Sequence, residues 1–254
     1  MIDYLQVEKN DIDELFDSYV DSLSGPYDDY LEDHILDSQF YTIEFEAEVV
    51  GFFAIFESSL LTQFFVKEES IHLAQMCFKS ILKKFNITHG YVPTCDELFL
   101  SLSMDFHTRI DLQAYIFHDT KREVEPPVYP KSMLRLANLS DVEDIKRLSG
   151  DFFSELYQAV SDRKIYILED DEIYGFGIIE VNKIHTNCRG TGMYTVEKHR
   201  QKGVGRSIIL HLKDLCETLE YHALPACWYH NYNSKSTLES CGFAATTRLL
   251  KVEF

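Results

Sequence analysis

The segment 192–206, GMYTVEKHRQKGVGR, holds the residue types best suited to chemistry in this chain. Arg200 and Lys202 carry positive charge, and Gly203 and Gly205 follow closely. Glycines let a backbone approach phosphate oxygens, and the unpaired N–H groups at a helix N-terminus attract anions. If a helix begins at this point, the segment is suited to hold a phosphate or pyrophosphate group.

A strand and an amphipathic helix are the elements that would position this loop. Residues 193–196 are typical of a strand. The apolar residues that follow the loop share one face of a helix: Ile208, Ile209, Leu212, Leu215, Cys216 and Leu219. The glycine spacing fits neither the Rossmann nor the Walker pattern, so a nucleoside triphosphate site is not expected. A plain helix cap remains the simpler alternative.

Three ordered motifs carry a family resemblance. The arrangement Tyr194-Thr195-Val196-x-x-x-Arg200-x-x-Gly203-x-Gly205 resembles the pyrophosphate-binding motif of the GCN5-related N-acetyltransferases (GNAT). A strand at 225–229 with Asn231, Ser234 and Cys241-Gly242-Phe243 is similar to the family's second motif. The segment 133–148, MLRLANLSDVEDIKRL, looks like its first strand and helix. The resemblance covers about 120 residues of the second half.

The resemblance implies a site for acetyl-CoA, used as acyl donor, and no metal. In such enzymes the strand before the loop splays from its neighbour at a bulge and holds the pantetheine arm, which is the place of Met193, Tyr194 and Thr195. The pyrophosphate would be held by Arg200, Gln201, Lys202, Gly203, Val204, Gly205 and Arg206. Asn231 and Ser234 match positions at the far end of the arm, or they form only a turn and a helix cap.

The two halves of the chain show the same order of signals, which indicates an internal duplication. Residues 40–57 (FYTIEFEAEVVGFFAIFE) and 164–181 (KIYILEDDEIYGFGIIEV) each predict two strands joined by a tight acidic turn. Gly51 and Gly175 occupy matching places in these segments. The first half, however, has lost the loop: residues 66–72, VKEESIH, contain no glycine and two acids. We therefore expect no coenzyme A there, and a degenerate copy that stabilises the fold and walls the acceptor pocket.

Helices and a closing strand complete the pattern. Polar, helix-like runs cover 10–23 and 140–156, and the second opens with Ser140 three residues before Glu143, the spacing of a capping box. Residues 248–254 alternate as a closing strand does.

The resemblance implies an α/β fold in the broad sense, more exactly an α+β fold with a mixed sheet. We expect two tandem GNAT-like acyl-CoA N-acyltransferase domains, each a twisted mixed, mostly antiparallel sheet flanked by helices. Residues 122–131, REVEPPVYPK, hold three of the six prolines and predict a linker. The expected divisions are a degenerate domain at 1–125, a proline-rich linker at 126–131 and a GNAT N-acetyltransferase domain at 132–254.

Direct acyl transfer to an amine needs a proton acceptor and a donor for the departing thiolate. Glu180 is the first candidate base, with His185, Tyr194 and Tyr229 as alternatives, and it can equally be an ordinary exposed strand residue. The family often places an acid tyrosine where this chain has Leu238, so Tyr229, Tyr232, Ser234 or Ser236 would substitute, or the thiolate leaves unaided. Cys227 and Cys241 are interpreted as core residues rather than nucleophiles.

Composition narrows the partners and the location. The net charge is −18, and residues 1–130 contribute −17 of it, which disfavours nucleic acids and anionic membranes as partners. The six cysteines show no zinc spacing and are expected to be reduced. No apolar run is long enough for a membrane helix, and the acidic start does not resemble a secretion signal, so we expect a cytoplasmic protein.

Three hypotheses remain open from the sequence. The first is an N-acetyltransferase whose acceptor is a small-molecule or protein amine, in a monomer or homodimer. The acidic first half favours a cationic acceptor, although salt screens such attraction. The second is a non-catalytic acyl-CoA-binding or sensing module, and the third is a structural partner protein that binds no coenzyme A.

Overall fold

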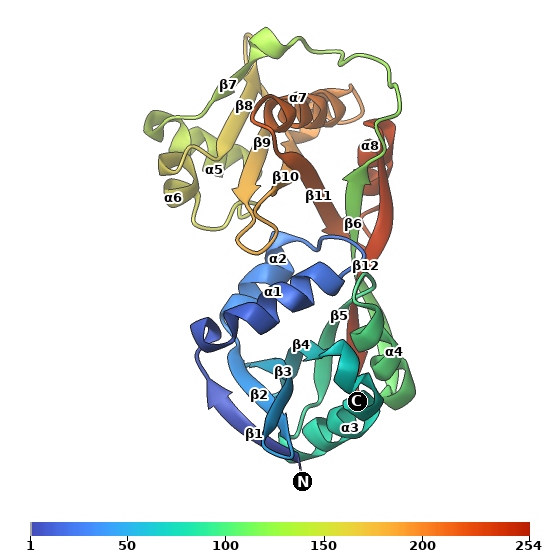
Figure 1. Ribbon diagram of the computed structural model, residues 1–254. Coiled ribbons are helices and arrows are strands. Elements are labelled where there is room, and N and C mark those ends of the chain that lie inside the picture. Colours follow the sequence, from blue (N-terminus) through green and yellow to red (C-terminus); the bar gives the residue numbers. More distant parts are fainter. Residues whose placement is uncertain (1) are drawn as a thin grey trace. The chain divides into compact units, whose positions relative to one another are not determined.

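The computed structural model describes residues 2–254, which form two compact units (Figure 1). Unit 1 comprises Met1–Tyr115 and Thr247–Phe254, and unit 2 comprises Ile116–Thr246. The last eight residues of the chain thus belong to the first unit and residues 116–125 to the second. The domains expected from the sequence, at 1–125 and 132–254, stay a prediction. Residues 122–130, within the segment interpreted as a linker, form no helix or strand.

Unit 1 is a mixed sheet between two pairs of helices. Its strands follow the order β1-β2-β3-β4-β5-β12. The elements are β1 Ile2–Val7, α1 Asp13–Ser22, α2 Asp29–Leu36, β2 Gln39–Phe45, β3 Glu48–Phe56, β4 Leu60–Val66, α3 Ala74–Lys84, β5 His89–Pro93 and α4 Glu97–Phe106, with short 3-10 turns at Lys9–Ile12 and Glu68–Leu73. Strands β6 (Arg109–Asp119) and β12 (Phe243–Glu253) are each divided between the units.

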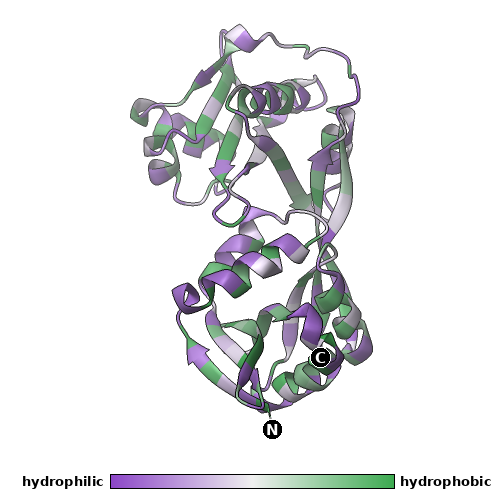
Figure 2. Ribbon diagram, in the orientation of Figure 1, coloured by the Kyte–Doolittle hydropathy of each residue, from purple (hydrophilic) through white to green (hydrophobic). Residues whose placement is uncertain are grey.

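Alternating side chains of this sheet pack on helices of opposite faces. Phe52 on β3 contacts the rings of Phe16 and Tyr19 on α1. Its neighbour Phe53 belongs instead to the core that includes Phe78 of α3 and residues of α4. The period of two in β3 thus buries both faces of the strand, and Figure 2 shows the hydrophobic residues gathered on the strands and inner helix faces.

Unit 2 repeats the same plan. Its strands follow the order β6-β11-β10-β9-β8-β7. The elements are β7 Leu134–Leu136, α5 Val142–Ser149, α6 Leu156–Ser161, β8 Ile165–Glu169, β9 Ile173–Val181, β10 Cys188–Thr195, α7 Val204–Thr218, β11 His222–Trp228 and α8 Tyr232–Ser240, with 3-10 turns at Lys131–Met133, Leu139–Asp141 and Glu197–His199. Helices α5 and α6 pack against Phe176 of β9, and α7 packs against Ile179 of the same strand.

The matching glycines of the two halves have the same structural reason. A Cβ atom at Gly51 would lie 2.1 Å from the carbonyl oxygen of Phe65, and one at Gly175 would lie 2.5 Å from that of Tyr194. In both units the glycine therefore lets two neighbouring strands approach. The two predicted strand pairs are also confirmed, as β2–β3 and β8–β9.

Three local predictions from the sequence are wrong. The capping box before α5 is formed by Asn138 and Asp141, not by Ser140 and Glu143, because the chain first makes a 3-10 turn. Leu219 is 62% exposed, because it follows the last turn of α7. The closing strand begins five residues earlier than expected, at Phe243.

The end of β12 completes the core of unit 1. Leu249 to Glu253 pair antiparallel with β5, from Pro93 back to His89. Leu250 and Val252 are buried in the core cluster that also contains Val92. Residues far apart in sequence thus share one core.

Leu250→Ala should destabilise unit 1, because it removes buried methyl groups and leaves a cavity. The free energy of unfolding should fall by about 2–5 kcal/mol. Hydrogen exchange should show protection lost in β3, β4 and β5, with Lys251→Ala on the same strand as the control. Loss of protection confined to β8 and β9 would contradict this assignment of the strand.

Two buried aspartates begin helices of unit 1. Asp28 accepts from Leu31 N at 3.2 Å and Asp96 accepts from Phe99 N at 3.0 Å. Burial raises the pKa of each carboxyl from 3.8 to about 7. The folded state therefore holds both protons up to about pH 7, whereas the unfolded chain releases them near pH 4. Stability contributed by these protons is lost as the pH rises from about 4 to 7.

Asp96→Asn should remove its share of this loss, because asparagine mimics the protonated carboxyl and still accepts from Phe99 N. The groups facing Asp96 are Tyr19 of α1, Tyr27 and Cys95, which stay neutral over this range. Urea unfolding at pH 5 and pH 8 should show the variant gaining on the order of 2 kcal/mol relative to the parent protein. If the stability of the two proteins changes equally with pH, burial does not raise the pKa of Asp96.

Candidate acyl-donor site

Strands β10 and β11 of unit 2 part from each other midway along their length. Their parallel pairing runs from Cys188–His222 to Thr191–Pro225 and is recorded no further among residues 2–254. Both strands continue, β10 to Thr195 and β11 to Trp228. Backbone groups of β10 beyond Thr191 therefore face an open side, and an extended amide-containing molecule can take the place of the missing strand.

The other side of β10 remains fully paired. Seven consecutive residues, Arg189 to Thr195, pair with Val181 to Gly175 of β9 without a register shift. The bulge that the family resemblance implied is therefore absent from this pair of strands. The opening arises where the β10–β11 ladder ends, at a proline that has no N–H to donate.

A tight loop joins β10 to the N-terminus of α7. Gln201 and Gly203 have positive φ values of 60° and 82°, and Gly203 is the N-cap of a 15-residue helix. No side chain caps this helix. The first N–H groups of α7 are thus left for an outside acceptor, and the helix dipole favours an anion there. This confirms the predicted strand, loop and helix.

Gly205 leaves room between the helix and the strand. A Cβ atom there would lie 3.1 Å from Thr195 Oγ1 and 3.5 Å from Met193 Cγ. These contacts bring three residues expected to bind the cofactor, from the strand and the helix, to one place. The opening of the ladder, the uncapped helix and this close approach fit a pyrophosphate joined to an extended arm.

The three basic residues of the loop differ in their surroundings. Arg200 and Lys202 are exposed, and no ion pair is recorded for either within the described chain. Arg206 instead donates to the carbonyl oxygens of Pro126, at 2.9 Å, and Glu125. Its guanidinium therefore holds the linker against α7, so Arg200 and Lys202 are the better partners for an anion.

Polar side chains of α7 bind the linker. The apolar periodicity of the helix sequence did not predict these contacts. Ser207 and His211 are buried on the helix. The Ser207 hydroxyl accepts from Tyr129 N at 3.2 Å, and His211 Nε2 lies 2.8 Å from the carbonyl oxygen of Tyr129. Val128 also lies over Gly203, where a Cβ atom would meet its Cγ2 at 2.9 Å.

The second motif lies at the start of α8. The side chain of Asn231 accepts from Ser234 N at 3.1 Å, so it caps this helix. Leu238, at the family's tyrosine position, is 1% exposed in the core. Burial raises the pKa of the Cys227 thiol, which argues against a reactive thiolate.

The candidate proton acceptors lie in different surroundings. Glu180 Oε2 contacts Lys164 Nζ at 2.7 Å, and both side chains are less than one-third exposed. The Tyr194 hydroxyl donates to the carbonyl oxygen of Leu148 at 3.0 Å, and its ring packs on Phe152. Tyr194 is thereby tied to the α5–α6 face, so its backbone is better placed than its side chain for binding.

The equivalent segment of unit 1 has a different structure. Residues Glu68–Leu73 form a 3-10 turn ahead of α3, with Glu68 and Glu69 in its first turn. Carboxylates at this place repel a pyrophosphate. The loss of the phosphate loop in the first half, as expected from the sequence, is therefore visible in the fold.

Two sequence matches decide the family. Residues 8–120 match a family described as acetyltransferase (GNAT) domain, and residues 132–243 match the acetyltransferase (GNAT) family. The chain belongs to the GNAT acetyltransferases. The GNAT domains are arranged in tandem, as the internal repeat predicted. No curated protein sequence matches the chain.

Solved structures share the GNAT fold along the whole chain. An acetyltransferase of the GNAT family from Colwellia psychrerythraea has a TM-score of 0.87 at 16% identity and covers 99% of both chains. A GCN5-related N-acetyltransferase from Sphaerobacter thermophilus has a TM-score of 0.64 at 9% identity, covering 99% of this chain and 95% of that one. A tandem GNAT protein from the clavulanic acid biosynthesis pathway gives 0.61 at 13% identity, covering 99% and 98%.

Other structural features bear on the remaining expectations. No helix of residues 2–254 has the length and apolar character needed to cross a membrane. All six cysteines are free. Among the described residues, no three His, Cys, Asp or Glu side chains are grouped to hold a metal ion.

Proposed function

We propose that unit 2 binds acetyl-CoA and transfers its acetyl group to an amine. The observation that carries this proposal is the joint opening of the β10–β11 ladder and the uncapped N-terminus of α7 at Gly203. Exposed backbone groups suit the amides of a pantetheine arm, and the helix start suits a pyrophosphate.

Each part of the cofactor has residues of this chain to hold it. The backbone of Met193, Tyr194 and Thr195 lines the open strand edge. The amides of Val204 and Gly205, with Arg200 and Lys202, would hold the pyrophosphate. At the start of α8 the Asn231 side chain accepts from Ser234 N, so it serves as the cap of this helix. Acetyl-CoA, when bound, supplies a thioester that an amine can attack.

Glu180 remains our candidate for the proton acceptor. Its carboxylate is partly buried and is oriented by its contact with Lys164. An amine must lose a proton as it attacks, and a fixed carboxylate can take it directly or through water. Tyr229 and Ser234 are the remaining candidates for returning a proton to the departing thiolate, because Leu238 has no polar group.

A binding module that senses acyl-CoA without transfer is the alternative, and the buried Leu238 favours it. In the acetyltransferase, the acceptor is an amine whose identity is set by residues outside the donor site. The location we propose is the cytoplasm.

Neutralising the loop should weaken acetyl-CoA binding. Arg200→Gln and Lys202→Gln together should raise the dissociation constant by about tenfold to a hundredfold, because two charge-assisted contacts are lost. Calorimetric titration of the full chain measures this, with Lys146→Gln, an exposed lysine of α5, as the control. Equal affinity in the parent protein, the double variant and Lys146→Gln would show that this loop does not hold the pyrophosphate. These exposed positions are preferable to Gly203, where a side chain would also displace Val128.

Glu180→Gln should leave acetyl-CoA affinity unchanged and lower kcat by about 10² to 10⁴-fold. The measurement is coenzyme A release across a panel of amines by the full chain. Glu239→Gln is a matched control, because Glu239 also pairs with a lysine of unit 2, Lys235. Unchanged turnover would show that Glu180 is not the proton acceptor. If no amine is acetylated although acetyl-CoA binds, the sensing alternative holds.

A further inference from the structure

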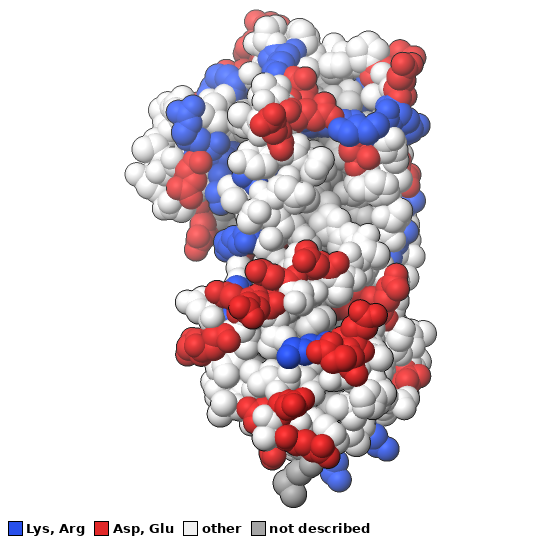
Figure 3. Space-filling model, viewed as in Figure 1, with Lys and Arg blue, Asp and Glu red and all other residues white. Residues whose placement is uncertain are grey.

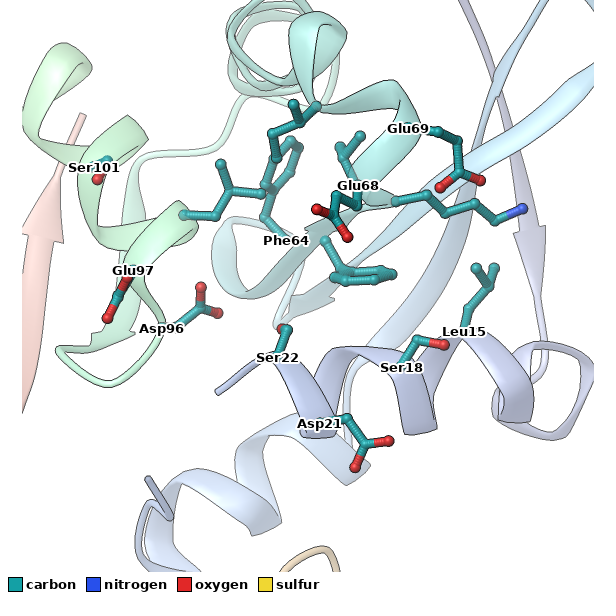
Figure 4. A pocket seen from close by; sticks show the side chains of 15 residues that line it. Leu15, Ser18, Asp21, Ser22, Phe64, Glu68, Glu69, Asp96, Glu97 and Ser101 are labelled. Atoms are coloured by element: carbon teal, nitrogen blue, oxygen red, sulfur yellow. The ribbon is translucent and has the colours of Figure 1, made fainter. Parts of the chain in front are cut away.

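Two strands that part do not by themselves make an anion site, as unit 1 shows. Within residues 2–254, β5 pairs with β4 at Leu60 and Leu61 alone, although β4 continues to Val66. The space beside the end of β4 is a cavity of about 930 Å³, and Glu68 and Glu69 line it (Figure 4). Acidic side chains also predominate on the face of unit 1 that Figure 3 shows. The anion site of unit 2 therefore depends on the loop before α7 and on the contacts that hold this loop in shape.

The loop at residues 200–203 has a backbone conformation that needs support. Gln201 and Gly203 both have positive φ values, and this region is costly for a residue with a side chain such as glutamine. Residues 200–202 are exposed, so their side chains add little packing. No side chain caps the helix that follows. The shape of the loop must therefore be set by contacts at its two ends.

The linker contacts the end of the loop at which α7 begins, and Figure 1 shows it running past this helix. Val128 Cγ2 would lie 2.9 Å from a Cβ atom at Gly203. The Tyr129 N–H donates to Ser207 Oγ at 3.2 Å, and His211 Nε2 donates to the Tyr129 carbonyl oxygen at 2.8 Å. Both side chains of α7 are buried. The two backbone polar groups of Tyr129 are thus bound by the first turns of the helix.

The Tyr129 side chain is connected to the other end of the loop. The centroid of its ring lies 5.3 Å from that of Tyr174, and the Tyr174 ring lies 4.7 Å from the ring of His199. His199 is buried and is the last residue of the 3-10 turn that directly precedes Arg200. One linker residue is therefore connected to both ends of the loop, through its backbone at one end and through packed rings at the other.

We propose that Tyr129 is a positioning residue of the donor site. By holding both ends of the loop at residues 200–203, it keeps the N–H groups at the start of α7 directed at the pyrophosphate of acetyl-CoA. A loop already held in its binding shape loses less conformational freedom when the ligand binds. Because such coupling is reciprocal, bound acetyl-CoA must also hold the linker more firmly. The proposal rests on the binding of acetyl-CoA by unit 2.

Calorimetric titration of the full chain with acetyl-CoA tests this role. Tyr129→Ala should raise the dissociation constant by about fivefold to thirtyfold, because the loop must then be ordered on binding. Tyr129→Phe keeps the ring and should bind as the parent protein does. Tyr157→Ala, which removes an exposed tyrosine of α6, is the matched control. A linker that only stabilises the fold would lower the free energy of unfolding in Tyr129→Ala and leave the affinity unchanged, and that result would overturn the proposal.

Hydrogen exchange of the parent protein tests the reciprocal effect and needs no variant. Saturating acetyl-CoA should slow exchange of the Val128 and Tyr129 N–H groups, by up to about the same fivefold to thirtyfold factor. Unchanged exchange at these two residues, with protection gained at residues 193–206, would overturn this proposal and leave the proposed function in place. If acetyl-CoA neither binds in the titration nor changes exchange anywhere, the proposed function fails and the role of Tyr129 fails with it.

Discussion

The parting of two parallel strands governs what each unit of this protein can bind. In unit 2 the ladder between β10 and β11 ends at Thr191 and Pro225, although both strands continue. Backbone groups that a sheet normally pairs are left open, and they need partners. The uncapped start of α7 lies near the end of the same strand, where Gly205 approaches Thr195, so an open strand edge and a helix start suited to an anion lie side by side.

The same break occurs in unit 1 with different side chains around it. There the turn after β4 carries Glu68 and Glu69 in place of the glycine loop. The same backbone plan thus carries a glycine loop before α7 in one unit and an acidic turn before α3 in the other. The backbone fixes where a cleft opens, and a few charges decide its ligand.

Much of this was visible in the sequence because it is local. The hairpins at β2–β3 and β8–β9, the matching Gly51 and Gly175, and the loop before α7 follow from periodicity and glycine positions. Within α7, apolar periodicity found Ile208 and Leu212 correctly.

What the sequence missed depends on long-range partners. Alternation predicts that the chain ends in a strand, but not that Leu250 packs in the core of unit 1. Ser207 and His211 interrupt the apolar face of α7 because the linker bonds to them there. The buried oxygen of Asp96 is likewise apparent only once β4, β5 and α4 are folded together. A helix cap such as Asn138 competes with nearby Ser140 on geometry that spacing alone does not fix.

Hydrogen exchange of the full chain with and without acetyl-CoA tests the central claim most directly. Open strand edges and free helix N–H groups should become protected when they gain a partner. The account predicts protection at residues 193–206 of unit 2 and none at residues 62–73 of unit 1. Protection in unit 1, or no change at 193–206 in the presence of saturating acetyl-CoA, would contradict it.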